Sequence, residues 1–506
     1  MNRHLELNPN ELTSLRSVDE RLMSYNIEMT EITGGTFWKA YTPGQIAGID
    51  KFTSSGDLSN FTSMADLMQY YPPIDLRNKK LRYLTQQLGP AWIRVSGSWA
   101  TKTYYDFEGT TNGHIPEGYA SILTREQWMD LLDFVKATKG KLLVSVSNCA
   151  GDHPNGGAFD LTQTKKLFHF SHEYGVDIAA AEFMNEPNML EFSGAPSGYT
   201  AVDYARDQDI FNTWVRENYP DCLLVGPCTT GDPTITLSQP KGFGAGIASL
   251  MKNCTSTDDL LAGTKVKLDV FSYHYYNGVS ERLASIALQA HWQPQEAHTD
   301  AYLAVAEEYA GAHALLRDKY VPAAPIWVTE SGDAGGGGDT WASTYLDVLR
   351  TLNELGSFAT ITDGVIFHNT LASSDYGFLR PGDFEPRPNY YAVLLWNTLM
   401  GNTVYHCQNH PMESVHLYCH SRKDKKPGCV YLVINNSPTD NLTVTCPLDV
   451  ELYLLSSDSE MRSQTICLNG KPLYLSEYGD LPMLCGKKIS AGIIELPPSS
   501  CSFLVV

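Results

Sequence analysis

Two glutamates follow apolar segments of the chain, each where a predicted strand ends. Glu186 comes directly after the run 178–185 and is preceded by Asn185, and Glu330 closes the run 326–330. In a parallel barrel the carboxyl ends of all strands open at one mouth, so both side chains would face the same cleft. A single glutamate in such a place would be an ordinary surface or ion-paired residue. Two of them suit cleavage of a glycosidic bond, in which one carboxylic acid protonates the leaving oxygen and one carboxylate attacks the anomeric carbon.

The elements that must position these side chains alternate along residues 20–395. Short runs rich in Val, Ile and Leu are typical of buried parallel strands, and amphipathic segments between them are typical of helices. The alternation predicts the α/β class, as a (β/α)₈ TIM barrel over residues 19–400. An open doubly wound sheet is the alternative, but no Gly-x-Gly-x-x-Gly follows the first strand. The predicted strands are 22–28, 91–96, 141–147, 178–185, 222–227, 268–274, 326–330 and 364–369, and the predicted helices are 125–138 (with Thr124 and Gln127 spaced as a capping box), 202–219, 301–320, 341–355 and 390–400.

The pattern changes after residue 400. Short apolar runs separated by Pro, Asn, Asp and Gly predict an accessory C-terminal antiparallel β-sandwich over residues 401–506. Residues 1–18 are expected to complete this domain, through a strand at 5–7. The predicted sandwich strands are 415–418, 430–435, 442–445 and 450–455.

Composition narrows the class of partner. Of the 506 residues, 43% are hydrophobic and 19% are charged, as in ordinary globular proteins, and no apolar run is long enough to span a membrane. The net charge of -20 makes nucleic acid and membrane surfaces poor partners. The 11 cysteines include no Cys-x-x-Cys and no zinc spacing, so buried thiols are favoured over a disulfide framework, and no metal or cofactor is predicted. The polar first residues favour a cytoplasmic protein over a secreted one whose leader was removed.

Several segments in order resemble glycoside hydrolase family 79, which contains the heparanases, β-glucuronidases and leech-type hyaluronidases. Asn185-Glu186-Pro187 together with Glu330 resembles the signature of the large retaining (β/α)₈ glycosidase clan. The likeness covers nearly the whole chain. It departs from the family at Met184, where the family often has Gly, and at 329–332, where Thr-Glu-Ser-Gly replaces Gly-Glu-Thr-Ser. The other matching segments are 19–28, 88–98, 273–278, 374–379, 386–391 and 401–404.

The resemblance implies a role for each residue near the two glutamates. Glu186 would be the acid/base and Glu330 the nucleophile of a double displacement. Asn185 would bind the sugar 2-hydroxyl, a contact that strengthens in the transition state. One residue of the pair Tyr275 and Tyr276 would donate a hydrogen bond to Glu330, while the other packs in the core. His274 either lines the site or is structural.

A uronic acid carries a carboxylate, which requires hydrogen-bond donors. Backbone N–H groups of the glycine run 335–338, at Gly336 and Gly337, are expected to form an anion nest, and the Tyr376 hydroxyl to add a bond. Glu28 and Ser98, after the first and second strands, are expected to bind the remaining hydroxyls.

The strong acidity favours an exo-β-glucuronidase acting on a glucuronide or the end of a glucuronic-acid-containing glycan. An endo-acting heparanase or hyaluronidase must hold a polyanion, and the densest basic run, 422–426, falls in the predicted sandwich. Two further readings stay open. One is a carbohydrate-binding barrel without catalysis, and the other is a clan member acting on neutral sugars, such as an arabinofuranosidase or xylosidase. The sequence makes no prediction of oligomeric state.

Overall fold

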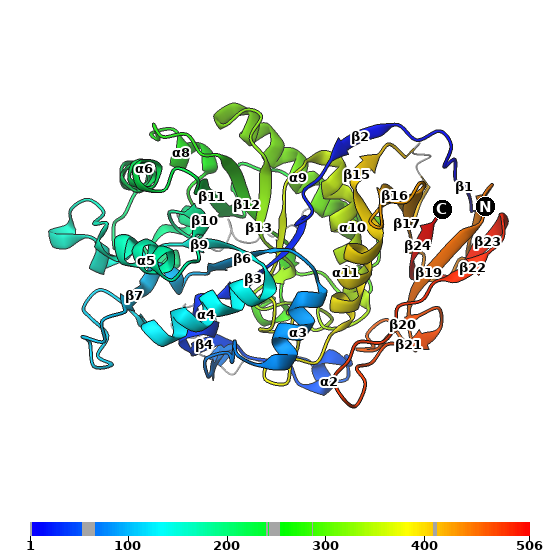
Figure 1. Cartoon of the computed structure of the whole chain (residues 1–506), viewed down its shortest axis with the longest axis horizontal. Coiled ribbons are helices and arrows are strands. Elements are labelled where there is room, and N and C mark those ends of the chain that lie inside the picture. The colour runs from blue at the N-terminus through cyan, green and yellow to red at the C-terminus, as the bar shows by residue number, and fades with distance from the viewer. Residues whose placement is uncertain (1–2, 53–65, 239–240, 242–253, 286, 408–411) are drawn as a thin grey trace.

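A computed structural model describes residues 3–52, 66–238, 241, 254–285, 287–407 and 412–506. Its central feature is a closed barrel of eight parallel strands, which confirms the predicted fold class and all eight predicted strands. Figure 1 shows this barrel at the left and centre, with a second group of strands at the right. In barrel order the strands are β3 (Met23–Glu28), β6 (Trp92–Ser96), β9 (Lys141–Ser145), β10 (Ile178–Glu182), β11 (Leu223–Thr230), β12 (Val270–Val279), β13 (Ile326–Gly335) and β14 (Ile366–His368).

Strands β12 and β13 are longer than their apolar runs. Beyond the predicted ends they continue to pair with each other, with Gly278 opposite Ala334 and Val279 opposite Gly335. Every residue of both strands is buried, although their second halves are polar or glycine-rich. Glu330 therefore lies inside β13 and not at its end, and Glu186 lies four residues beyond the last residue of β10.

Helices connect the strands on the outside of the barrel. α4 has the predicted bounds, and Thr124 and Gln127 form the expected capping box. Within the described residues, no helix is both long and apolar enough to cross a membrane. The helices are α1 (Met29–Thr33), α2 (Pro43–Ile46), α3 (Lys79–Gln87), α4 (Arg125–Thr138), α5 (Thr162–Glu173), α6 (Ala201–Asn218), α8 (Thr257–Leu261), α9 (Asp300–Tyr320), α10 (Leu346–Ile361) and α11 (Pro388–Leu399).

Helix α10 is displaced from its prediction at both ends. It begins five residues later than expected, because the N–H groups of Tyr345 and Leu346 donate to carbonyls of Ser463 and Met461 in the C-terminal part of the chain. It continues past Gly356, where a side chain would collide with the ring of Tyr418. The glycine here permits close packing of two elements and does not end the helix.

The C-terminal strands and the N-terminal segment form two further sheets. The larger contains β2 (Ser14–Ser17), β15 (Met400–Tyr405), β16 (Val415–Arg422), β17 (Cys429–Asn435), β19 (Val450–Ser457), β20 (Ile466–Leu468), β21 (Lys471–Pro472), β22 (Lys487–Ile489) and β24 (Ser500–Val505). The smaller contains β1 (His4–Glu6), β18 (Leu442–Cys446) and β23 (Gly492–Leu496). β1 pairs with β18 in parallel, whereas β18 and β23 are antiparallel.

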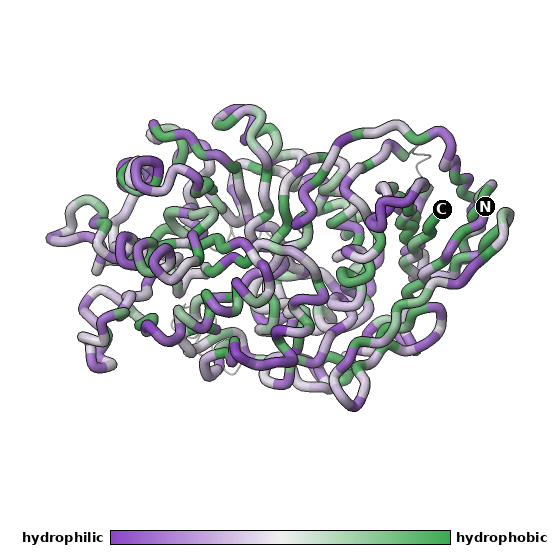
Figure 2. The backbone as a smooth tube through the Cα atoms, in the orientation of Figure 1, coloured by the Kyte–Doolittle hydropathy of each residue, from purple (hydrophilic) through white to green (hydrophobic). Residues whose placement is uncertain are grey.

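Both parts of the molecule have an apolar interior. Figure 2 shows hydrophobic residues along the strands of the barrel and of the C-terminal sheets, with hydrophilic residues on outer helices and loops. Helix α10 lies between the two parts and is almost wholly buried. Preceding it, Tyr345 donates through its hydroxyl to carbonyls of Leu455 and Ser499 at 2.9 and 3.1 Å. The eleven cysteines, all within the described residues, are free thiols.

Candidate active site

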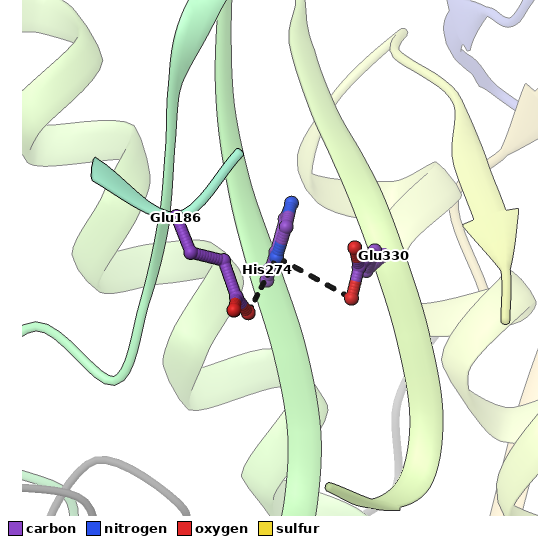
Figure 3. Close-up of side chains that lie close together, drawn as sticks. All are labelled: Glu186, His274 and Glu330. Atoms are coloured by element: carbon purple, nitrogen blue, oxygen red, sulfur yellow. Dashed lines mark hydrogen bonds and ion pairs between the residues drawn. The ribbon is translucent and has the colours of Figure 1, made fainter. Parts of the chain in front are cut away.

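Glu186, His274 and Glu330 meet at the mouth of the barrel (Figure 3). His274 Nδ1 lies 2.9 Å from Glu186 Oε1 and 3.5 Å from Glu330 Oε2. One oxygen of each carboxyl group lies within 4.8 Å of an oxygen of the other. Retaining glycosidases hold their two carboxyl groups about 5–5.5 Å apart and inverting ones about 6.5–9.5 Å apart, so this proximity favours retention.

A buried arginine that the sequence analysis did not select lies beneath this pair. Arg94, on β6, has no exposed surface, and its Nη1 donates to Glu330 Oε1 at 3.0 Å. Its remaining contacts are with Glu182 at 2.9 Å, with Asn185 Oδ1 at 2.9 Å and with His274 Nε2 at 3.2 Å. One cation thus binds two carboxylates and fixes two neutral side chains of the site. In the sequence, Arg94 and Glu182 are charged residues within apolar strand runs. This pattern could have identified both as buried, paired charges.

Tyr276 supplies a second donor to Glu330. Its hydroxyl donates to Glu330 Oε2 at 2.7 Å, so both oxygens of this carboxylate accept hydrogen bonds. The Asn369 amide donates to the Tyr276 hydroxyl at 3.0 Å and to the Tyr376 hydroxyl at 3.1 Å. Because the amide donates to both hydroxyls, each phenol keeps its own proton for another acceptor. Tyr276 keeps this proton and directs it at Glu330 as a hydrogen bond.

Asn185 has its amide orientation fixed by donors around it. Its Oδ1 accepts from Arg94 Nη2 at 2.9 Å and from Ser96 Oγ at 3.1 Å. Arginine can only donate, so the oxygen of the Asn185 amide must face Arg94 and the NH₂ group must face the other way. This leaves the side chain as a hydrogen-bond donor beside Glu186, which suits the predicted contact with a sugar hydroxyl.

The two glutamates lie in different electrostatic surroundings. Burial, and then the negative charge of Glu330, raise the pKa of Glu186 well above its ordinary value. Burial also raises the pKa of Glu330, but the charge of Arg94 and hydrogen bonds from Tyr276 and Arg94 oppose this rise. Interacting carboxyl groups that are pushed apart in this way divide into an acid and an anion. The arrangement favours a protonated Glu186 beside an ionised Glu330.

His274 is neutral and has one defined tautomer. Burial, and then the charge of Arg94, lower the pKa of His274 well below its ordinary value. Since Arg94 donates to Nε2, the ring proton is on Nδ1, where it points at the Glu186 carboxyl. Three ligand atoms within 4.8 Å of one another also have the spacing of a metal site. A metal would need the lone pair that the proton on Nδ1 occupies, so this tautomer favours a hydrogen-bonded trio over a metal centre.

The predicted uronate-binding residues lie together on two adjoining loops. Gly336 and Gly337 have φ angles of 92° and 90°, which favour glycine, and a side chain at Gly337 would collide with Trp38 and Ser374. Tyr376 is buried on the loop after β14, with its ring 6.5 Å from that of Tyr276. The two loops are joined, because the Gly337 carbonyl accepts from Ser374 Oγ at 2.9 Å.

The remaining predicted site residues, Glu28, Ser98 and Tyr275, differ in burial and in orientation. Glu28, the last residue of β3, is buried beside Gly97, and burial together with the charge of Glu330 raises its pKa well above the ordinary value. Ser98 is half-buried on the loop after β6. Tyr275 points away from the site into the layer beneath α9, where its ring lies 5.6 Å from that of Tyr309. Neighbouring residues of a strand face opposite sides, so Tyr276 is the member of the pair that reaches Glu330 and Tyr275 is the one that packs in the core, away from any substrate.

Comparison with proteins of known sequence gives relatives over most of the chain. Heparanase-like protein 1 of Arabidopsis thaliana is 26% identical, covering 86% of this chain and 85% of the relative. Heparanase of Bos taurus is 29% identical, covering 85% of this chain and 84% of the relative. Baicalin-beta-D-glucuronidase of Scutellaria baicalensis is 23% identical, covering 85% of this chain and 83% of the relative. No protein-family model matches the chain.

Solved structures share the fold across almost the whole chain. A 4-O-alpha-L-rhamnosyl-beta-D-glucuronidase from Fusarium oxysporum superposes with a TM-score of 0.65 at 12% identity, covering 99% of this chain and 100% of that one. A GH51 alpha-L-arabinofuranosidase from Thermotoga petrophila superposes with a TM-score of 0.61 at 13% identity, covering 99% of both chains. At these identities the superpositions establish the fold alone, and the sequence relatives carry the kinship. The chain is a relative of heparanases and of a plant β-glucuronidase over most of its length, which confirms its resemblance to glycoside hydrolase family 79.

Proposed function

We propose that this chain is a retaining exo-β-glucuronidase, which releases β-linked glucuronic acid by double displacement. The observation that carries the proposal is the buried pair of Glu186 and Glu330, with oxygens within 4.8 Å and with different hydrogen-bonding environments. The relatives whose names include a β-glucuronidase and several heparanases support the choice of substrate class.

In the first step, Glu330 attacks the anomeric carbon while Glu186 gives its proton to the departing oxygen. His274 Nδ1–H donates to Glu186 Oε1, which places the acidic proton of Glu186 on Oε2. That oxygen then delivers the proton to the leaving group. Asn185 holds the sugar 2-hydroxyl through its NH₂ group as positive charge develops on the ring.

In the second step, water attacks the glycosyl-enzyme ester and Glu186, now ionised, takes its proton. Glu330 leaves as a carboxylate that is again stabilised by Arg94 and Tyr276. Forming the ester removes the negative charge of Glu330, which lowers the pKa of Glu186 relative to the free enzyme and fits it to act as a base. The same residue thereby serves as acid and then as base.

Recognition of the uronate carboxylate is assigned to neutral donors. Tyr376 keeps its hydroxyl proton because Asn369 donates to its oxygen, and the glycine loop offers backbone N–H groups beside it. An uncompensated Lys or Arg in contact with the sugar would compete for the catalytic carboxylates. Neutral donors bind the anion and leave Glu330 free to react.

An exo-acting enzyme fits the distribution of basic residues better than an endo-acting one. The densest basic run, 422–426, lies at the turn between β16 and β17 in the C-terminal sheets, and Arg422 there pairs with Asp424 at 2.9 Å. This turn is not part of the barrel mouth. With a net charge of -20, the chain lacks the overall attraction that a sulfated polyanion would need.

Hydrolysis of matched aryl β-glucuronide and aryl β-glucoside substrates tests the proposal. The expected result is a kcat/KM for the glucuronide at least about tenfold above that for the glucoside, which corresponds to about 1.4 kcal/mol of transition-state discrimination. A preference for the glucoside, or for an arabinofuranoside or xyloside, would exclude uronate recognition. Binding of glucuronides without hydrolysis of any substrate would instead indicate a carbohydrate-binding barrel.

A further inference from the structure

Two buried arginines hold the loops that carry the proposed carboxylate-binding groups. Arg282, on the short turn of helix after β12 (Glu281–Leu283), has a side chain with no exposed surface. Its Nε and Nη2 donate to the Lys39 carbonyl at 3.0 and 2.6 Å, and its Nη1 donates to the carbonyls of Gly336 and Gly338 at 3.1 and 2.8 Å. A further bond from Nη2 reaches Asp375 Oδ2.

These contacts use all five N–H donors of the Arg282 guanidinium. The Arg282 guanidinium also stacks at 3.6 Å on the ring of Tyr41, whose N–H donates to Asp375 Oδ2 at 3.2 Å. No donor of Arg282 remains for a ligand. Its position at the junction of three loops therefore serves to orient them and cannot serve to bind substrate directly.

Arg282 determines the direction of a peptide group in the glycine loop. In a trans peptide, the C=O of one residue and the N–H of the next point in opposite directions. With the Gly336 carbonyl turned toward Arg282, the N–H of Gly337 must point away from it. The next carbonyl, of Gly337, is held by Ser374 Oγ and by the Asp375 N–H at 2.9 and 3.2 Å. The Gly337 N–H therefore points to the side opposite to Arg282, whereas the N–H of Gly338 donates to the Ala334 carbonyl at 3.1 Å.

Arg387, just before α11, does the same for the loop that carries Tyr376. Its Nη1 donates to the carbonyls of Ser374, Asp375 and Gly377 at 2.7, 2.9 and 3.0 Å. The fourth carbonyl of this stretch, that of Tyr376, accepts from His368 Nε2 at 2.6 Å. Four successive carbonyls are thus bound, three by Arg387 and one by His368, which fixes the backbone that carries the Tyr376 side chain.

We propose that Arg282 and Arg387 are positioning residues for uronate recognition: they turn the carbonyls of both loops away from the sugar so that N–H and O–H donors face its carboxylate. This inference rests on the proposed glucuronidase function and deepens it. The Arg282 guanidinium, whose five N–H donors are all engaged, also places positive charge behind the loop donors without contacting the substrate, where low dielectric strengthens its effect on an anion.

The test compares Arg282→Lys and Arg387→Lys, which keep the charge but lose the planar fork that binds several carbonyls at once. Arg462→Lys is the matched control, because half-buried Arg462 also donates to backbone carbonyls, those of Gln45 and Ile46, and among the described residues it donates to no carbonyl of either loop. Each variant is assayed for kcat and KM on 4-nitrophenyl β-glucuronide and β-glucoside and for inhibition by free D-glucuronate, and its melting temperature is recorded.

The expected result is a fall of about tenfold or more in the glucuronide-to-glucoside ratio of kcat/KM for both loop variants, as when a hydrogen bond to a charged group is lost. The loss should appear mainly in KM and in a matching weaker inhibition by D-glucuronate, while Arg462→Lys keeps the wild-type ratio. Equal losses on both substrates, or a changed ratio in Arg462→Lys as well, would overturn the inference.

Two other outcomes, a failure of the variants to fold and a failure of the proposed function itself, can be told apart from a failure of the inference. If the lysine variants fail to fold, Asp375→Asn replaces them. This change weakens the ionic contact between Asp375 and Arg282 and leaves both arginines in place. A smaller fall in the same ratio then supports the inference, and an unchanged ratio overturns it. If wild-type protein does not prefer the glucuronide at all, the proposed function has failed and not only the role of these arginines.

Discussion

Replacing Tyr276 with Phe should move the acidic limb of the pH profile to higher pH. The Tyr276 hydroxyl donates to Glu330 Oε2 at 2.7 Å, and such a bond stabilises the ionised carboxylate relative to the protonated acid. A hydrogen bond to a charged group contributes about 1.5–3 kcal/mol, and 1.36 kcal/mol corresponds to about one pKa unit. Losing the bond should therefore raise the pKa of Glu330 by about one to two units. Arg94 continues to donate to the other oxygen, which favours the lower end of this range.

The assay is kcat/KM for an aryl β-glucuronide as a function of pH. Below the pKa of Glu330 the nucleophile is protonated and inactive, so a raised pKa means that activity is lost at a higher pH as the solution is acidified. Tyr275→Phe is the matched control: the neighbouring Tyr275 is also buried but lies on the other face of β12, and among the described residues its hydroxyl has no hydrogen-bond partner. A Tyr276→Phe profile with lower rates at every pH but an unmoved acidic limb would refute the role given to this hydroxyl.

Three further outcomes are expected. Glu186→Ala should slow aryl glucuronides with poor leaving groups far more than those with good ones, because good leaving groups need little protonation; equal slowing across a leaving-group series would contradict the acid role. Tyr376→Phe should lower kcat/KM for a glucuronide by about one to two orders of magnitude, and much less for the glucoside, as kinetics on the paired substrates will show. A chain ending near residue 400 should be insoluble on expression, because α10 and the apolar barrel face that it shares with the C-terminal sheets would be exposed; a soluble and fully active truncation would show that those sheets are dispensable.

The barrel was predictable because its strands are buried on both faces and therefore appear as continuous apolar runs. The same rule failed where β12 and β13 continue through Gly278 and Gly335, since these residues are buried by pairing and not by hydrophobicity. Strands such as β2 and β22 were missed because they are short, polar and partly exposed.

The catalytic candidates were predictable because a carboxylate at the end of an apolar run is conspicuous, although in the structure Glu330 lies inside β13; their environment was only partly predictable. Arg94 and Glu182 stood in the predicted strands as charged residues within apolar runs, and the burial of a charge should have indicated a partner. Which of Tyr275 and Tyr276 faces Glu330 depends on the register of β12, which shifts between Tyr273 and His274. The roles of Arg282 and Arg387 depend on loops that are distant in sequence, so only the folded structure brings them together.

The stereochemistry of the first product tests the central claim most directly. Proton NMR during hydrolysis of an aryl β-glucuronide distinguishes the anomer that is released first from the one formed later by mutarotation. With the carboxyl oxygens of Glu186 and Glu330 within 4.8 Å of each other, we predict that β-glucuronic acid appears first. Initial release of the α-anomer would mean a single displacement by water, and it would contradict the assignment of Glu330 as the nucleophile.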